Sequence, residues 1–491
     1  MKDRASSTFF LGLFFVILLQ NSSFPFVTAD DVPVCSTDER CTQLNRECLF
    51  DDNYNNSTSC GECLDGFIEY PGGGIADTET SNSKSDNDRI FSSPCLAVDA
   101  LSWELFESNF DLYYKQDDQV LTPAERLVVL LENARFISEN HSNSNGNNDT
   151  SSSASAYQLG LAPFSADTGS DYLHRSGYFY VDLTDSTAAE ELTEYDMPTV
   201  AAADLPTSVD WVNAGAVTSV KDQGRCGCCW AVSLAGAVEG AAYIENKYFQ
   251  SMSFQQFISC NDRNLGCDGG NVAISAVYAV LNDFGGLVRL NDYEYTDYRG
   301  QTTEQCDLST DVTPLAVEIN DKPAIVAGIN KVMSHEQRVE AFKQALADRP
   351  VSMLMKSSCK TLSNYKSGVL TDDGDCQVFS VDDIDHAVLM VGYGVDESSG
   401  LSYFKLKNSW GTKWGEDGFF RVADTEKNRY GLFGILSEGY IIANARNVTE
   451  EVPDQSQDVP LLPIWAIVLI SLAGCCCCIT MIGVWRRMRE D

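Results

Sequence analysis

The stretch Lys221-Asp-Gln-Gly-Arg-Cys-Gly-Cys-Cys-Trp-Ala-Val-Ser233 constrains the fold of this chain more than any other feature. A turn over residues 223–227 leads directly into a run of small apolar residues that is typical of a buried helix. Cys229 would lie at the N-terminus of that helix, where unpaired backbone N–H groups and the helix dipole favour a thiolate. Because the thiolate is the form of cysteine that attacks carbonyl carbon, the stretch predicts a cysteine nucleophile.

A nucleophile of this kind needs a base, and the chain has four histidines. His386 opens the run Ala-Val-Leu-Met-Val-Gly-Tyr, which predicts a buried strand, and Asn408 follows it in Lys-Asn-Ser-Trp-Gly. A single histidine before a strand is more often structural. The other three offer less, because His141 lies in a Ser/Asn-rich tract, His174 between tyrosines, and His335 at a predicted, exposed helix start. His386 is therefore the candidate base.

Together, these residues resemble the papain-like cysteine proteases. The family signature C-G-[SA]-C-[WY], with a histidine and an asparagine well downstream, is met by Cys226-Gly-Cys-Cys-Trp230 except at Cys228. The resemblance extends over residues 205–445. It implies an α+β, papain-like two-domain fold, in which a helical domain carries the nucleophile, a β-barrel-like domain carries the base, and the cleft lies between them.

The resemblance also implies a role for each residue of the cleft. Cys229 is expected to be the nucleophile, His386 the base and then the acid toward the leaving amine, and Asn408 the group that orients the imidazole. The Gln223 side chain and the Cys229 backbone N–H would form the oxyanion hole. Six further positions are expected to line or shield the cleft: Gly269, Gly270, Val272, Ala387, Trp410 and Glu438. No cofactor and no metal are expected.

Glu438 bears on specificity. The alignment of Tyr430-Gly-Leu-Phe-Gly-Ile-Leu-Ser-Glu438 places it at the base of the main specificity pocket, where some members of the family carry glutamate. A carboxylate there would accept Arg or Lys, besides apolar side chains, at the second residue before the cut. In the alternative, Glu438 is a surface residue of a shifted loop.

The cysteines of this region are expected to form disulfides. By resemblance, two bridges are expected in the first domain: Cys226 with Cys267, and Cys260 with Cys306. The family's third bridge is not reproduced, because Phe433 stands where its late cysteine would be, and Cys359 and Cys376 could instead pair locally. Cys228 is left without an obvious partner. It is either a buried apolar stand-in for Ser or Ala, or a site that makes the enzyme sensitive to oxidation.

The chain before the protease region divides into three segments. Residues 1–29 combine a basic start, a short apolar run and a small-residue cleavage site, which predicts a secretory signal peptide. Residues 30–95 hold six cysteines among polar residues, which is typical of a disulfide-stapled module. Its pair Cys60-Gly-Glu-Cys63 lacks the nearby histidine or second pair of a zinc site. Residues 96–204 are expected to form an inhibitory propeptide.

The propeptide assignment depends on a predicted helix with Thr122 as its N-cap and Pro123 at its first position. Four residues match spaced positions of the family's propeptide helix: Arg126, Val129, Asn133 and Ile137. An ordinary amphipathic helix is the alternative, but the place just before the protease favours a propeptide. Residues 160–167 resemble, imperfectly, the short motif that follows that helix. The resemblance implies a segment that blocks the cleft until it is cut off near Asp204-Leu-Pro206.

The end of the chain predicts a membrane anchor. The peptidase domain (205–445) is followed by an acidic linker (446–458) and an uncharged run (459–485) that is long enough to span a bilayer as one helix. The arginines of the tail (486–491) should stay cytosolic, so we expect a single-pass type I protein of the secretory or endolysosomal pathway with a lumenal or extracellular catalytic domain. Five sequons predict exposed glycosylation: Asn55, Asn56, Asn140, Asn148 and Asn447.

These features predict a membrane-anchored, zymogen-activated cysteine endopeptidase that acts on proteins or peptides and is inhibited by its own propeptide. The net charge of −37 argues against nucleic acid as a partner. The alternative is a catalytically inert papain-like fold that serves as a binding or adhesion receptor through its N-terminal cysteine-rich module.

Overall fold

The computed structural model of the chain describes most of the protease region and parts of the segment before it. The described residues are 46–50, 58–63, 67–69, 95–97, 101, 103, 106, 107, 122–143, 156–167, 175–180, 191–195 and 204–448, without 282–284, 301–304, 309–314, 373 and 427. One compact unit, Met1–Asn447, contains all of these but Val448. The second unit, Val448–Asp491, lies outside the described residues apart from Val448.

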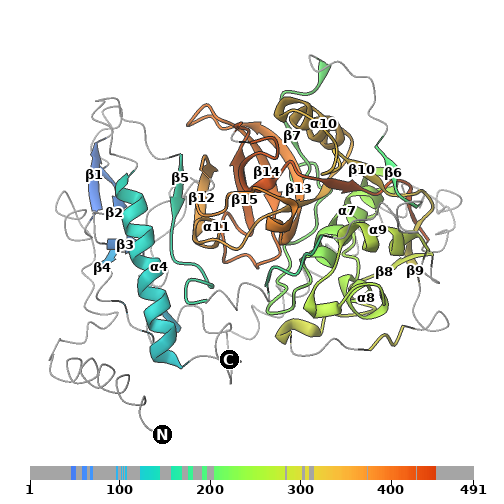
Figure 1. The fold of residues 1–491 in the computed structure, drawn as a ribbon, viewed down its shortest axis with the longest axis horizontal. Helices are drawn as coiled ribbons and strands as arrows, with labels where there is room; N and C mark the ends of the chain where they lie inside the picture. The colour runs from blue at the N-terminus through green and yellow to red at the C-terminus, as the bar shows by residue number, and fades with distance from the viewer. Residues whose placement is uncertain are drawn as a thin grey trace, which may run out of the picture. The chain divides into compact units, whose positions relative to one another are not determined.

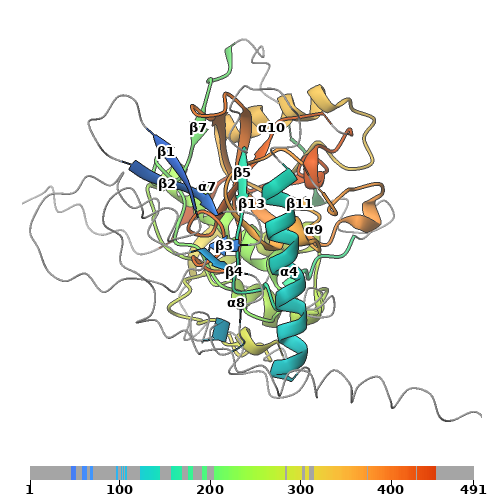
Figure 2. The same ribbon diagram turned by 90° about the vertical axis from the view of Figure 1, so that its left-hand side faces the viewer.

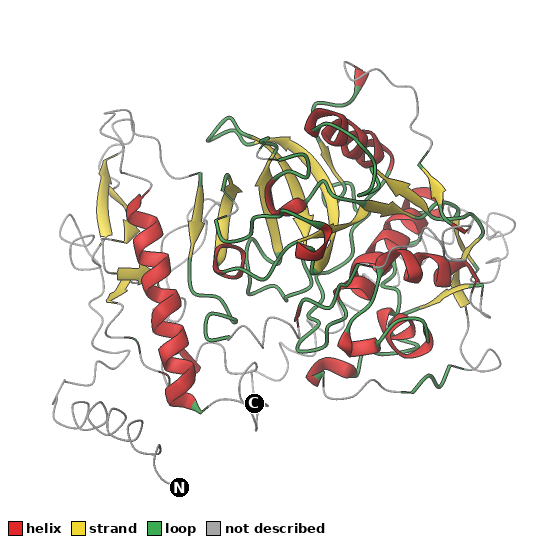
Figure 3. Ribbon diagram, in the orientation of Figure 1, coloured by secondary structure: helices red, strands yellow, loops and turns green. Residues whose placement is uncertain are grey.

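The first half of the protease is helical, as predicted (Figure 3). Its helices are α7 (Cys229–Asn246), α8 (Phe254–Cys260) and α9 (Val272–Leu281), and beside them lies a three-stranded sheet in the order β17 (Ala445–Asn447), β9 (Leu315–Ile319), β8 (Gly286–Val288). Small residues let neighbours approach α7 closely. A Cβ on Gly236 would lie 2.9 Å from the Leu389 side chain, and one on Gly240 2.8 Å from Pro350.

The second half supplies most strands of a ten-stranded sheet, which confirms the β domain and the strand predicted after His386. Its order is β5-β12-β15-β14-β13-β11-β16-β10-β6, with β7 paired to β13. The strands are β5 (Tyr157–Leu159), β6 (Thr193–Glu194), β7 (Val209–Asp210), β10 (Ala324–Val326), β11 (Val351–Met355), β12 (Tyr365–Leu370), β13 (His386–Val395), β14 (Ser402–Lys407), β15 (Phe419–Ala423) and β16 (Gly439–Ile441). Shorter elements are α11 (Lys360–Ser363) and the 3₁₀ turns η5 (Gly266–Asp268), η6 (Asp297–Arg299), η7 (Val381–Asp383) and η8 (Leu432–Gly434).

Helix α7 packs against strand β13, and this contact joins the two halves (Figure 1). Strand β13 is buried along almost its whole length because β11 and β14 flank it and α7 covers it. The run of apolar residues after His386 is therefore a consequence of its central place. Each of the two elements begins with a candidate catalytic residue, Cys229 on α7 and His386 on β13.

The helix predicted for the propeptide is α4 (Pro123–Asn143), with Pro123 at its first position as expected. Thr122 caps it reciprocally with Glu125, since each accepts a hydrogen bond from the backbone N–H of the other. Helix α4 lies beside strand β5, which extends the sheet by pairing with β12 (Figure 2). Two of the family-matching positions hold the loop after β5: Arg126 bonds to the carbonyl of Ala166, and Asn133 to that of Ser165.

One expectation about a histidine was wrong. His335 begins helix α10 (His335–Asp348), as the sequence suggested, but it is buried, and its Nε2 lies 3.6 Å from an Asp424 oxygen. The exposed cap of this helix is Ser334, which forms a capping box with Gln337. A histidine inside the first turn can point back toward the sheet, which the pattern of the sequence alone did not reveal.

Several predicted segments lie outside the described residues. These are the signal peptide, the membrane span, the cytosolic tail, the acidic linker beyond Val448 and the sequons at Asn55, Asn56 and Asn148. Of the cysteine-rich module, the structure describes only the backbone of two antiparallel strand pairs, β1 (Arg46–Phe50) with β2 (Thr58–Cys63) and β3 (Phe67–Glu69) with β4 (Cys95–Ala97), the last of which continues into the next segment. Among the described helices, none is long and apolar enough to cross a membrane. The sequon residues Asn140 and Asn447 are both exposed.

Candidate active site

Cys229 is the first residue of α7, as the sequence predicted. The turn before it is held by the disulfide between Cys226 and Cys267 and by a 2.9 Å hydrogen bond from the Gly227 N–H to the Cys267 carbonyl. Cys228 occupies the N-cap position of the helix. The Cys229 thiol is fully buried and accepts a backbone hydrogen bond from Ala387, which places it beside the start of β13.

His386 is held at the other side of the cleft by Asn408, whose Oδ1 lies 2.9 Å from the histidine Nε2. The same Oδ1 accepts the backbone N–H of Ser409 at 2.8 Å, so it is the acceptor and His386 Nε2 is the donor. With its proton on Nε2, the imidazole keeps Nδ1 as its basic nitrogen. Among the described residues, that buried Nδ1 has no hydrogen-bond partner, so it is available to a thiol proton.

Trp410 shields this pair from water. Its ring lies 5.2 Å from that of His386 and 5.0 Å from that of Trp414 between centroids, and it is almost fully buried. Phe164, from the loop after β5, packs edge-on against Trp410 at 5.5 Å. A hydrogen bond without competing water has a stronger electrostatic component, so the two rings stabilise the orientation of His386.

Gln223 lies where the resemblance expects an oxyanion hole. Its side-chain Nε2 donates to the Cys226 carbonyl at 2.8 Å and to the Arg175 carbonyl at 2.9 Å. Its Oε1 accepts a 2.5 Å hydrogen bond from Ser409 Oγ, and its backbone N–H donates to the Ser409 carbonyl at 2.9 Å. The carbonyl oxygen of Arg175, a propeptide residue, therefore occupies the position that this donor would offer to a developing oxyanion.

The segment Arg175–Tyr180 runs through the cleft. It pairs in parallel with Gly270, which donates to the Gly177 carbonyl at 2.6 Å and accepts the Phe179 N–H at 3.2 Å. The Tyr178 N–H donates to the Asp385 carbonyl at 3.0 Å. The upstream segment also approaches Gly269 closely, because a Cβ added to Gly269 would lie 2.6 Å from the Gly177 carbonyl oxygen. The glycines expected to bind substrate backbone therefore bind the backbone of the chain's own upstream segment.

Tyr178 is the buried side chain of this segment that lies nearest the expected specificity residues in charge and packing. It belongs to the same buried cluster as Val272 and Ala387, and its hydroxyl accepts a 3.3 Å hydrogen bond from Asn271 Nδ2. Burial raises the pKa of Tyr178 well above its ordinary value, and the charge of Glu438 raises it further. Glu438 is thus an electrostatic neighbour of this side chain.

Glu438 is 7% exposed, which excludes the alternative of a surface residue in a shifted loop. Its Oε2 accepts the Ile329 N–H at 2.8 Å, and its Oε1 accepts the hydroxyl of Tyr440. Burial raises the pKa of the Glu438 carboxyl, although both hydrogen bonds and the charge of Arg338 oppose that rise. The site therefore holds a carboxyl group whose charge is sensitive to acid pH.

Burial also affects the protonation of the candidate catalytic pair, Cys229 and His386. It raises the pKa of the Cys229 thiol to about 12, against the hydrogen bond from Ala387. It lowers the pKa of His386, against the hydrogen bond from Asn408 and the charge of Asp385. With the cleft filled, a thiol and a neutral imidazole are thus favoured over the ion pair, and opening the cleft to water removes that bias.

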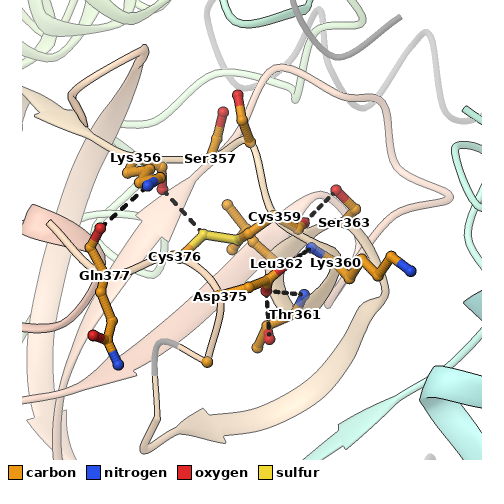
Figure 4. The surroundings of a disulfide bond; sticks show 12 residues. Lys356, Ser357, Cys359, Lys360, Thr361, Leu362, Ser363, Asp375, Cys376 and Gln377 are labelled. Carbon is orange, nitrogen blue, oxygen red and sulfur yellow. Dashed lines mark hydrogen bonds between the residues drawn. A yellow bond between two sulfur atoms is a disulfide. The ribbon is translucent and has the colours of Figure 1, made fainter. Parts of the chain in front are cut away.

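The structure contains three disulfides in the described part of the protease: Cys226–Cys267, Cys260–Cys306 and Cys359–Cys376. Figure 4 shows the local bridge, which joins Cys359 before α11 to Cys376 in the loop that leads to His386. In that loop, the Asp375 carboxylate also accepts the backbone N–H of Lys360 at 2.9 Å. The bridge and this hydrogen bond attach the loop to α11. Cys228 and Cys229 are the cysteines of the described protease outside disulfides.

Sequence reasoning missed two residues that support the site. Ser409 bonds to Gln223 through both backbone and side chain, and Asp385 accepts hydrogen bonds from the backbone N–H groups of Ser357 (2.7 Å) and Ser358 (3.2 Å). Both lie next to predicted catalytic residues, so adjacency was the one available signal. Within the described residues, no group of three His, Cys, Asp or Glu side chains could hold a metal ion.

Comparison with known proteins agrees with this geometry. A family model described as papain family cysteine protease matches residues 205–438. The senescence-specific cysteine protease SAG12 of Arabidopsis thaliana is 31% identical over 350 residues, which cover 70% of this chain and 94% of that protein. Probable cysteine protease RDL4 of the same plant is 34% identical over 365 residues, which cover 74% of this chain and 90% of that protein.

Solved proforms share the fold. The ragweed pollen cysteine protease Amb a 11 in its proform is 27% identical with a TM-score of 0.53, covering 69% of this chain and 95% of that one. Digestive procathepsin L2 from the Tenebrio molitor larval midgut is 25% identical with a TM-score of 0.55, and the match covers 70% of this chain and 98% of that one. With a cysteine on a helix N-terminus, a histidine oriented by asparagine and relatives of this extent, the chain belongs to the papain family of cysteine proteases and is a cysteine-type endopeptidase.

Proposed function

We propose that the chain is made as a zymogen whose segment Arg175–Tyr180 keeps the catalytic pair covered until it is cut away. The observation that carries this proposal is the 2.9 Å hydrogen bond from Gln223 Nε2 to the Arg175 carbonyl, beside a fully buried Cys229. A substrate carbonyl has to reach the same donor. The proforms among the similar structures support the same role for the upstream segment.

Acylation begins when the Cys229 sulfur attacks the carbonyl carbon of the peptide bond, and the thiol proton passes to His386 Nδ1. The carbonyl oxygen becomes an oxyanion that accepts hydrogen bonds from Gln223 Nε2 and the Cys229 backbone N–H. Asn408 holds the proton on His386 Nε2 throughout, which keeps Nδ1 facing the reaction. When the C–N bond breaks, Nδ1–H protonates the leaving amine, and an acyl group remains on sulfur.

Deacylation uses the same groups in turn. A water molecule gives a proton to His386 Nδ1 and attacks the thioester carbon, and the oxyanion forms again in the same hole. Collapse expels the Cys229 sulfur, which takes back the proton, and the new carboxyl end of the substrate leaves. Protons and bonds balance with one water consumed for each peptide bond cut.

The pocket that Tyr178 fills is proposed to accept both aromatic and basic side chains. Its wall includes the apolar residues Val272 and Ala387, and the buried carboxyl of Glu438 lies close to the Tyr178 side chain. An arginine that enters the same pocket would extend its guanidinium toward Glu438, and the planar donors of that group suit a carboxylate.

We further propose that the enzyme is a type I membrane protein of the secretory or endolysosomal pathway. The uncharged run over residues 459–485 and the basic tail after it support an anchor. Partition of the full chain into a detergent phase, compared with a chain ending at residue 458, tests this proposal. Equal partition of both chains into the aqueous phase would contradict it.

The receptor alternative finds no support. An inert papain-like fold has no need of a histidine oriented by asparagine or of a fixed oxyanion donor, whereas both are in place here. The similar proteins named above are also described as proteases.

The decisive experiment uses the full chain in detergent, exposed to about pH 4.5 with reductant and then assayed with fluorogenic Phe-Arg and Arg-Arg dipeptides. We expect turnover that is lost in Cys229→Ala, since no other described group can form the acyl-enzyme at this site. If the wild-type chain shows no turnover after removal of the propeptide, with the fold intact, the proposed function is refuted.

A further inference from the structure

A tyrosine lies directly behind the oxyanion hole. Tyr295 Oη donates a 2.5 Å hydrogen bond to the backbone carbonyl of Gln223. The Cys228 sulfur lies 3.8 Å from the same Oη. Because the phenol proton goes to the carbonyl, the Cys228 thiol is the donor in the second contact. The neighbour of the nucleophile and the oxyanion residue are thus linked through one tyrosine.

Both groups of this relay keep their protons. Burial raises the pKa of the Cys228 thiol and that of the Tyr295 phenol. Each therefore remains a donor at any pH at which the enzyme works, as the chain of hydrogen bonds from thiol to phenol to carbonyl requires. The Tyr295 ring is fixed against Phe254, with 4.6 Å between the ring centroids.

The Gln223 backbone is held from two sides. Ser409, which follows β14, binds its N–H and its side chain, and Tyr295, from the helical half, binds its carbonyl. The next residue, Gly224, is in the left-handed region with φ +57°, and its N–H donates to Asp222 at 2.9 Å. The Gln223 carbonyl also accepts a longer, 3.3 Å hydrogen bond from the Cys226 N–H. Without the bond from Tyr295, this longer bond is what remains to hold the carbonyl on the helical side.

We propose that Tyr295 is a positioning residue for the oxyanion hole and that Cys228 supports it through a hydrogen bond from its thiol to Tyr295 Oη. The proposal rests on the proposed function, because it assigns Gln223 Nε2 to the oxyanion. It also gives the cysteine at position 228 a polar role that neither an apolar filler nor an oxidation-sensitive thiol would have. Tyr295 itself does not touch substrate.

The test compares three variants of the full chain after acid maturation: Tyr295→Phe, Cys228→Ala and Cys228→Ser. In Tyr295→Phe, we expect kcat to fall about three- to thirtyfold, below the loss for removing an oxyanion donor outright, with KM within twofold. The Ki of a peptide aldehyde should rise by the same factor, because the oxygen of its tetrahedral hemithioacetal occupies the hole. Cys228→Ala should lie between Tyr295→Phe and wild type, and Cys228→Ser, which keeps a donor, nearer to wild type.

Alkylation of Cys229 by iodoacetamide is the control readout, because it forms no oxyanion. An alkylation rate that falls along with kcat would mean general damage to the nucleophile and would overturn the proposal. So would a Tyr295→Phe loss that persists undiminished in a Gln223→Ala background, since the tyrosine then does not act through Gln223. If Tyr295→Phe does not fold, the same measurements are made on Cys228→Ala. Values of kcat and Ki equal to those of wild type in Cys228→Ala would then refute the relay. Absence of Cys229-dependent turnover in wild type would instead refute the proposed function.

Discussion

The substitution Gly177→Ala should displace the segment Arg175–Tyr180 from the cleft in part of the uncut molecules. An alanine Cβ at this position would lie 1.7 Å from the Gly227 carbonyl oxygen and 2.2 Å from its carbon. Both atoms belong to the backbone of the turn before Cys229, so no side chain can rotate out of the way. Since real Cβ atoms are not found within 3.0 Å of such atoms, the segment has to shift by at least 1.3 Å.

That shift breaks the pairing that holds the segment in the cleft. The bonds at risk are the 2.6 Å bond from Gly270 to the Gly177 carbonyl and the 3.2 Å bond from Phe179 to Gly270. Lost hydrogen bonds cost about 0.5–1.5 kcal/mol each, and overpacking costs about 1–3 kcal/mol. The two lost bonds alone amount to about 1–3 kcal/mol, which corresponds to roughly a 5- to 150-fold increase in the open fraction, and the overpacking adds to it.

The assay is the rate at which a thiol-reactive peptide probe labels Cys229 in the uncut full chain near neutral pH. The rate should rise in Gly177→Ala by at least that factor, because the probe reacts with the open form. Gly160→Ala is the matched control, since its Cβ meets only the flexible side chain of Lys366, at 3.0 Å, and labelling should stay within about twofold of wild type. Equal labelling of wild type and Gly177→Ala would refute the reasoning.

Three further perturbations test other parts of the site. Gln223→Ala should lower kcat about 10²- to 10³-fold with little change in KM, and a larger change in KM than in kcat would contradict its place in the oxyanion hole. Glu438→Ala should abolish cleavage of substrates with Arg at the second residue before the cut and spare substrates with Phe there. In wild type, the raised pKa of Glu438 means that its charge is lost on acidification earlier than for an ordinary glutamate, so the Arg-to-Phe ratio should fall as pH falls; a ratio flat with pH would count against it. The double change Cys359→Ser and Cys376→Ser opens a bridge with a sequence separation of 17 residues and should lower the free energy of unfolding by about 2–4 kcal/mol, measured by denaturant titration; an unchanged midpoint would show that the bridge is dispensable.

Some of the site was predictable because it depends on local pattern. The small apolar run after Cys229 predicts a buried helix, and the run after His386 predicts a buried strand, and both elements begin where those residues stand. The cap of α4 was equally local, because Thr122 and Glu125 are three residues apart and Pro123 suits a first turn.

Other features required contacts between distant parts of the chain. Glu438 is buried where its carboxylate accepts the backbone N–H of Ile329, 109 residues away, and no local periodicity separates that arrangement from a surface loop. His335 is likewise buried beside Asp424 although its helix start is polar. In both cases, the burial of a polar side chain is set by partners far away in sequence, which a single sequence does not align.

The candidate nucleophile, its candidate base and the elements that begin with them were predictable from the sequence, because composition and spacing act within a few residues. The groups that fill and support the cleft come together only in the folded chain: Tyr178 pairs in parallel with Gly270, and Tyr295 approaches Gln223 across 72 residues. Those contacts depend on how α7 packs against β13, and packing is a property of the whole core, in which side chains from every element compete for the same volume.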